Sequence, residues 1–447
     1  MSYVKRIWFH LNSSLWFVPA LLVAGAVALA TSMIELDLRS DIDLAARFPR
    51  LFGAGAEGSR GLLEAIATSM MTITGVTFSI TIVALALAST QYTPRILRNF
   101  MRNRTNQMTL GTFVGVFVYA LVVLRTIRGG DESFVPSLSV VVGILLTLVS
   151  VGVLILFIHH IASSIEASTL ISLAADETIS GLEELFVEAP AAEASEDGEP
   201  DDHPQGGTWQ AVAAPATGYI QSVDVELLID LAERRDVVLR MERSVGEFVV
   251  KGAPILAIHS SERPRADVCR RVALAFVIGR FRTIDQDPEF GIRQIVDIAL
   301  KALSPGVNDS TTAVTCIDYL SAILVELTRR RIENDYRSGE SRQLRVIARA
   351  STFEELLGKS FDQIRESASG NSAVLSRMLM AIETVARFAR TERQRRALES
   401  QIELISEVAH RTIFAPYSRR NMTERMHEAR MAIQRGRSSS RISSPAS

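Results

Sequence analysis

The chain of 447 residues has little of the chemistry that enzymes and disulfide-rich proteins need. Its two cysteines, Cys269 and Cys316, are too few for a disulfide framework or a four-cysteine zinc site. The net charge of −2 gives no overall attraction to nucleic acid. No H-E-x-x-H, Walker A or G-x-S-x-G motif occurs, and GAGAEG at 53–58 follows no convincing strand. We therefore expect no catalytic activity, no metal, no cofactor and no nucleic-acid partner.

Charge is also scarce over long stretches of the first 165 residues. A segment that crosses a bilayer needs about 20 apolar residues. Four such segments lie at about 13–34, 65–90, 108–127 and 136–161. No Asp, Glu, Lys or Arg lies in the middle of any of them, which argues against a proton-coupled transporter. The sequence predicts an α-helical integral membrane protein with four transmembrane helices within 1–165.

The charges between these segments predict their orientation. The 91–108 loop carries four arginines and no acid, whereas the 35–64 loop carries four arginines and six acids. Positively charged loops stay on the cytoplasmic side. We expect a multi-pass protein of the bacterial inner membrane, with both termini and the long C-terminal part in the cytoplasm.

The remaining sequence predicts a cytoplasmic α+β region. Helical periodicity continues over 166–186, a coupling helix, and an acidic, Pro- and Gly-rich stretch at 187–207 is typical of a flexible linker. Short apolar runs split by glycines predict a small β module at 208–262, similar to a barrel-sandwich hybrid. A helical domain follows at 263–436, where Thr352 and Glu355 form a predicted capping box, and then a disordered tail at 437–447.

Two stretches resemble the signatures of a bacterial family of predicted membrane proteins, domain of unknown function 2254. The first is SMMTITGVTFSITIVALALASTQYTPRILRNFMRNRTNQMTLGTFVGVFVYALVVLRT, and the second is QDPEFGIRQIVDIALKALSPGVNDSTTAVTCIDYL. Ser310 stands where the second signature often has proline. The resemblance covers about residues 1 to 430 and implies no activity.

The second apolar segment carries an unusual stripe of small and hydroxyl side chains. At 100° per residue, one helix face collects the residues Thr74, Thr77, Thr81, Ala84, Ala88 and Gln91. Continuing the helix brings Arg95, Arg98 and Arg102 to the same face, although Pro94 makes the register uncertain. One interpretation is close helix packing, with arginines anchoring the cytoplasmic end. The other is a pore lined by threonines, with an arginine collar at its cytoplasmic mouth.

A second group of polar residues flanks the second signature. Asp285, Asp287, Asn308 and Asp309 could form a cytoplasmic ligand or coupling site, although turn and cap roles explain them more simply.

Two functional hypotheses follow from these features. The first is a homo-oligomer in which the second spans surround a passive, channel-like path that favours anions and is regulated by the cytoplasmic domain. The alternative is a non-catalytic, membrane-anchored scaffold or sensor whose cytoplasmic domain binds a partner or small ligand. The lipid bilayer is the one partner the sequence identifies, and it names no protein partner.

Overall fold

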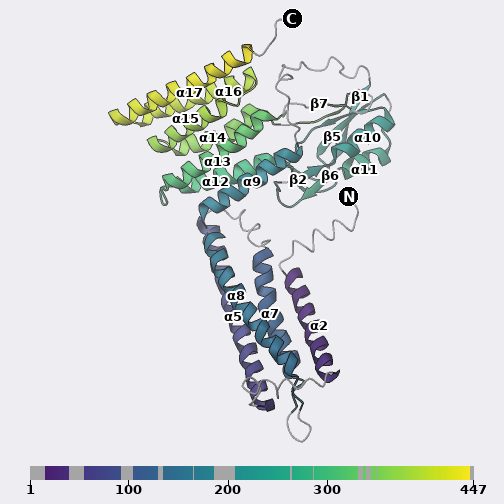
Figure 1. Cartoon of the computed structure of the whole chain (residues 1–447). Helices are drawn as coiled ribbons and strands as arrows, with labels where there is room; N and C mark the ends of the chain where they lie inside the picture. Colours follow the sequence, from purple (N-terminus) through teal and green to yellow (C-terminus); the bar gives the residue numbers. More distant parts are fainter. Residues whose placement is uncertain are drawn as a thin grey trace. The chain divides into compact units, whose positions relative to one another are not determined.

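The computed structural model divides the chain into two compact units, Met1–Glu166 and Ala167–Ser447 (Figure 1). All structural statements below concern the described residues, which are 16–39, 55–91, 104–128, 134–164, 166–185, 207–261, 264–284, 286–330, 336–338, 344–349 and 351–442. Residues 187–206 of the predicted linker at 187–207, and residues 443–447 of the predicted tail, lie outside them.

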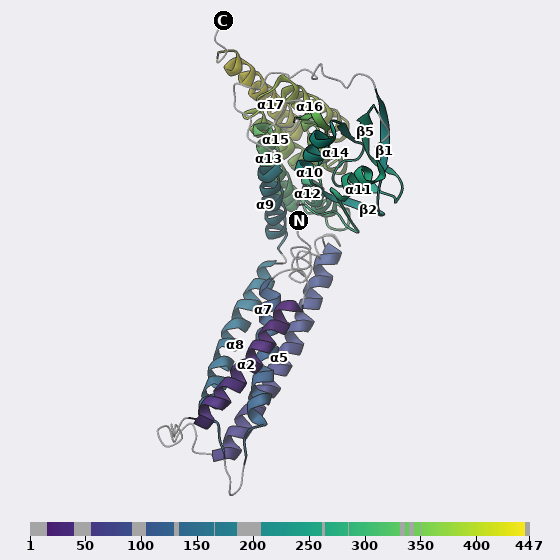
Figure 2. The same cartoon turned by 90° about the vertical axis from the view of Figure 1, so that its right-hand side faces the viewer.

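Long apolar helices make up the described part of the first unit, and Figures 1 and 2 show them side by side. They are α2 (Phe17–Arg39), α5 (Gly55–Gln91), α7 (Arg104–Leu124) and α8 (Ser137–Ser164). Each is long and apolar enough to cross a membrane, but so is α13 (Ser310–Arg329) of the second unit. The described residues therefore hold five candidate spans, and the predicted number of four is not confirmed.

Helix α7 is the centre of packing in the first unit. Phe113 and Tyr119 are fully buried, in a core to which α2, α5 and α8 also contribute. Two glycines one turn apart, Gly111 and Gly115, bring α7 against α2. A Cβ atom built on Gly111 would lie 2.8 Å from the Cα of Pro19, closer than real contacts allow. This is the small-xxx-small pattern of transmembrane helix pairs.

A group of hydrogen bonds joins α2, α7 and α8 where α2 ends and α8 begins. The carboxylate of Asp37 accepts hydrogen bonds from the backbone N–H groups of Leu138 and Ser139, at 3.0 and 2.9 Å, and from the Ser139 hydroxyl at 2.6 Å. The Tyr119 hydroxyl donates to the carbonyl of Ser139 at 2.8 Å. Asp37 thus satisfies free N–H groups at the start of α8, where a negative charge is favourable.

The β region of the second unit consists of two open sheets in its described residues, and a barrel-sandwich form is not confirmed. One sheet has the order β1-β5-β3-β8-β7 and the other β4-β2-β6. The strands are β1 (Thr208–Ala213), β2 (Gly218–Val223), β3 (Val238–Met241), β4 (Phe248–Val249), β5 (Pro254–Ser260), β6 (Phe276–Gly279), β7 (Tyr336–Ser338) and β8 (Leu344–Ile347).

This region differs from the predicted β module in two ways. Helix α10 (Val225–Arg235) interrupts its strands, and beyond residue 262, after helix α11 (Ala266–Leu274), strand β6 lies within the predicted helical domain. Asp224 caps α10 by accepting from the N–H of Leu227, and apolar residues recur at helical spacing along it. Strand β3 also pairs in parallel with β8, so the sheet draws on residues beyond 262.

The rest of the second unit is helical, as predicted. Its helices are α9 (Ala167–Leu185), α12 (Pro288–Ala302), α13, α14 (Phe353–Ser367), α15 (Ser372–Ala386), α16 (Glu392–Thr412) and α17 (Pro416–Ile442). The predicted capping box is present, with Thr352 and Glu355 exchanging hydrogen bonds at the start of α14. Helix α17 continues to Ile442, past the predicted start of the disordered tail.

Candidate functional site

The predicted threonine stripe lies on the face of α5 that turns into the first unit. Thr77 is 3% exposed, and Thr74 and Thr81 are half-buried. The hydroxyls of Thr74 and Thr81 donate to the carbonyls of Met70 and Thr77, at 2.7 and 2.8 Å. Such bonds to the preceding turn satisfy a hydroxyl within its own helix. The Thr77 hydroxyl is buried without a hydrogen-bond partner among the described residues.

Toward the end of α5 the stripe is covered by α8. Ala84 is 3% exposed and packs with Phe157 and Ile161 of α8. Ala88 and Gln91 belong to the helix, but their side chains are outside the described part of the chain. Arg95, Arg98 and Arg102, the predicted mouth, also lie outside it. Where it is described, the stripe is therefore a packing face within the first unit.

A different face of α5 is open. Its exposed small and hydroxyl residues recur every three or four positions, and they are Gly61, Ala65, Thr68, Thr72, Gly75 and Ser79. A Cβ atom built on Gly61 or Gly75 would meet nothing within 4 Å. Small residues let transmembrane backbones approach closely, so this face is suited to a neighbouring helix.

The predicted polar group at the second signature is split between the two ends of α12. Asp287 is 2% exposed, caps α12 by accepting from the N–H of Phe290, and takes two hydrogen bonds from Arg282 at 2.7 and 2.8 Å. Burial by itself would lower the pKa of Arg282. The hydrogen bonds and the negative charge of Asp287 outweigh it and raise the pKa of Arg282 above its ordinary value. This pair is internally satisfied, and Asp285 lies outside the described residues.

Asn308 and Asp309 begin the next helix. Asn308 has a positive φ of 51°, and Asp309 caps α13 by accepting from the N–H groups of Thr311 and Thr312. The Thr312 hydroxyl also donates to Asp309, and this bond lowers the pKa of that carboxyl. A helix of 15 residues separates these caps from Asp287, about 22 Å at 1.5 Å per residue. The structure therefore does not bring Asp287 together with Asn308 and Asp309.

The described residues of the second unit also form a groove between α15 and α17, which sequence reasoning missed. It has a volume of about 740 Å³. Its charged lining holds three arginines, a histidine and two glutamates, namely Arg387, Arg425, Arg435, His427, Glu383 and Glu428. Met431 and Ala432 add apolar surface. Arg387 pairs with Glu383 at 2.5 Å and Arg425 with Glu428 at 2.8 Å.

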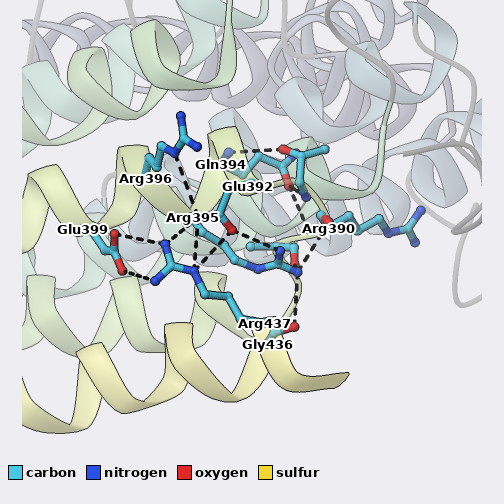
Figure 3. A network of polar contacts seen from close by, with 10 residues as sticks. Arg390, Glu392, Gln394, Arg395, Arg396, Glu399, Gly436 and Arg437 are labelled. Atoms are coloured by element: carbon cyan, nitrogen blue, oxygen red, sulfur yellow. Dashed lines mark hydrogen bonds and ion pairs between the residues drawn. The ribbon is translucent and has the colours of Figure 1, made fainter. Parts of the chain in front are cut away.

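Figure 3 shows the contacts that fix α17, one wall of this groove, against α16. Arg437 binds Glu392 and Glu399, with nitrogen–oxygen distances of 3.1 Å to each. Arg395, 5% exposed, donates to the carbonyl of Gly436 at 3.2 Å. The hydrogen bond from Arg437 lowers the pKa of Glu392. These residues come from separate helices. The sequence signal for them is limited to charged residues placed four positions apart along a helix.

The described residues contain no cluster of three His, Cys, Asp or Glu side chains that could hold a metal ion. Both cysteines are reduced, with Cys316 buried and Cys269 half-buried.

Comparisons with other proteins find relatives of this chain. A family model described as predicted membrane protein (DUF2254) matches residues 12–384. Uncharacterized proteins of Mycobacterium bovis and Mycobacterium tuberculosis are 32% identical over 431 residues, which is 94% of this chain and 80% of each relative. No solved structure matches the chain.

Proposed function

We propose a function on the premise that this chain belongs to the family of predicted membrane proteins (DUF2254). The proposal is a non-catalytic, membrane-anchored sensor, with four spans in the bacterial inner membrane and both termini in the cytoplasm. Its second unit takes an anionic ligand in the groove between α15 and α17. The three arginines that line that groove, together with its apolar surface, carry this proposal.

The four spans of this proposal are α2, α5, α7 and α8. Helix α13 differs from them because both of its ends are capped within the second unit, and it packs against α9, α12, α14 and α15. Its residues Cys316, Leu320 and Leu324 are fully buried among those helices. An apolar helix that is covered by protein on several sides is a core helix.

The groove suits an anion that has an apolar part. Arginine presents several donors in a fixed plane and binds phosphate or carboxylate oxygens bidentately. Arg387 is the C-cap residue of α15 and Arg425 lies in α17, so an anion between them would bridge the end of α15 and α17. The apolar surface of Met431 and Ala432 would contact the uncharged part of the ligand.

Inorganic pyrophosphate is a simple probe of this groove. The full chain in lipid nanodiscs is titrated with pyrophosphate, and the thermal unfolding midpoint is compared with that in sulfate at equal ionic strength. A ligand that binds only the folded state raises the midpoint. We expect a rise that Arg387→Gln combined with Arg425→Gln abolishes. The matched control pair, Arg234→Gln with Arg411→Gln, lies away from the groove and should keep the full rise in the unfolding midpoint. A rise that survives in the groove pair contradicts the proposal.

A homo-oligomeric channel is the second candidate, and the open face of α5 favours it. Residues that line a path between subunits must be exposed in one subunit, as Thr72, Gly75 and Ser79 are. On the buried threonine stripe, the Thr77 hydroxyl has no hydrogen-bond partner among the described residues. A path that contains water would supply one. Anion preference would come from the arginines at Arg95, Arg98 and Arg102, and gating from the second unit.

Ion flux in liposomes separates the two candidates. In the channel hypothesis Thr72→Leu, on the open face, lowers flux, while Thr77→Val, on the packed face, changes it little. Arg98→Glu shifts the preference between anions and cations. Absence of flux from folded oligomers, at both signs of voltage, leaves the sensor as the function.

A further inference from the structure

The three-stranded sheet β4-β2-β6 has one buried face, and its other face carries exposed apolar residues. Ile220, Val223 and Phe276 point into the core of the β region. On the other face, Phe248 is opposite Tyr219 and Tyr219 is opposite Gly279, so these positions share one side of the sheet. Side chains alternate along each strand, which adds residues 250 and 277 to the same side.

Large apolar side chains are exposed on this outer face and in the turns next to it. Their exposed fractions are 53% for Phe248, 56% for Val250, 40% for Val277 and 55% for Phe281. They form a patch that is concentrated on one sheet and its two adjoining turns, unlike the single exposed apolar residues that are normal on protein surfaces. We call the exposed side chains of the segments 248–252 and 277–281 the docking face, and they are Phe248, Val250, Lys251, Val277, Arg280 and Phe281.

The docking face is held in place by its own contacts. The rings of Tyr219 and Phe248 meet edge to face, with centroids 5.1 Å apart. The side-chain nitrogen of Gln221 donates to the carbonyl of Phe281 at 2.7 Å. The N–H of Lys251 donates to the Thr217 hydroxyl at 2.9 Å. The exposed aromatic residues are therefore presented by an ordered backbone, which lowers the entropy cost of docking.

The charge on the docking face has one sign. Lys251 and Arg280 are exposed, and neither segment of the face contains an aspartate or glutamate. Aromatic side chains flanked by basic residues are typical of surfaces that lie at a membrane interface, because the rings enter the headgroup region and the cations meet anionic lipids. A bilayer is also always nearby, since the same chain carries the apolar helices α2, α5, α7 and α8.

We propose that the docking face binds the anionic lipid surface of the membrane in which the chain is anchored. This proposal uses the membrane anchoring of the proposed function and is independent of the α15–α17 groove. Tethering makes the contact intramolecular, so two aromatic rings and two basic residues suffice for occupancy that a free domain would not reach.

The test places a nitroxide spin label on the full chain in nanodiscs. Phe281→Cys carries the label in a Cys269→Ser background, and Cys316 is fully buried. Power saturation compares collisions with oxygen, which concentrates in lipid, and with a water-soluble nickel chelate. The discs contain phosphatidylcholine alone or phosphatidylcholine with phosphatidylglycerol. We expect the oxygen-to-nickel ratio to rise in the anionic discs, and a label at Phe388→Cys on the helical region to show no change.

Charge variants provide the matched control. Lys251→Gln with Arg280→Gln is expected to lower the ratio of docked to undocked molecules by about 25-fold, given the usual contribution of each basic residue at an anionic surface. Arg234→Gln with Arg396→Gln removes the same charge from side chains that are 73% and 74% exposed elsewhere, and leaves docking unchanged. A ratio that is the same in both lipids overturns the proposal. A rise in the oxygen-to-nickel ratio that occurs only with two copies per disc also overturns it, because it identifies a second chain as the occupant.

Discussion

The contact between α2 and α7 makes a sharp prediction about Gly111. A Cβ atom built there lies 2.6 Å from the Cδ1 atom of Leu22 and 2.8 Å from the Cα atom of Pro19. The leucine methyl can rotate away, but the Pro19 backbone can move only if α2 moves. Gly111→Ala therefore forces the two helices apart.

Two effects determine how much Gly111→Ala changes the free energy of unfolding. Overpacking a close contact costs about 1–3 kcal/mol. Alanine also favours the helix over glycine by about 1 kcal/mol. Gly152→Ala in α8 isolates the second effect, because a Cβ atom built on Gly152 meets nothing within 4 Å. The difference between the two variants should therefore be about 1–3 kcal/mol, or roughly 5- to 150-fold in the unfolding equilibrium.

The assay is unfolding of the full chain by SDS in mixed micelles. Trp16 lies just before α2 and is 75% exposed, so its fluorescence follows that helix once Trp8 and Trp209 are replaced by phenylalanine. We expect Gly111→Ala to unfold at lower SDS than Gly152→Ala. Gly115→Ala should change little, because its nearest neighbours lie at 3.5 Å. Adding Leu22→Ala should restore only part of the loss.

Equal midpoints for Gly111→Ala and Gly152→Ala would refute the close approach of α2 and α7. Complete rescue by Leu22→Ala would also contradict the reasoning, because it would remove the Pro19 backbone as an obstacle.

Three further predictions concern other contacts. A Cβ atom built on Gly291 would lie 1.8 Å from the Thr178 hydroxyl, so Gly291→Ala should lower thermal stability and Thr178→Ala should partly rescue it. Asp37→Ala should destabilise the first unit by about 0.5–2 kcal/mol through loss of the α8 cap, and more than Glu35→Ala, which removes an exposed ion pair. Because Glu392 has a lowered pKa, its contribution is complete above its unfolded pKa and disappears as pH falls through its folded pKa. The stability difference between the parent chain and Arg437→Gln should therefore shrink on acidification, and a difference independent of pH would contradict this pair.

The sequence was sufficient where one local pattern decided the structure. The apolar runs coincide with α2, α5, α7 and α8, and the capping box formed at Thr352. The Asp309 cap was likewise readable, because a side chain two or three residues away satisfies it. The β-rich interpretation of 208–262 overlooked α10, although its signals, the Asp224 cap and the helical spacing of Leu228, Leu231 and Ala232, were present.

The sequence by itself determined where the apolar helices lie and which face of α5 collects Thr74, Thr77, Thr81 and Ala84. It did not determine their lengths, because α5 begins at Gly55, ten residues before the predicted segment at 65–90. A periodicity places residues on a common face but does not identify what that face contacts. Only the tertiary structure decided that Phe157 and Ile161 cover part of this face, while another line of small residues stays open. The groove between α15 and α17 and the docking face also required the fold, because each joins residues from separate elements whose proximity depends on packing.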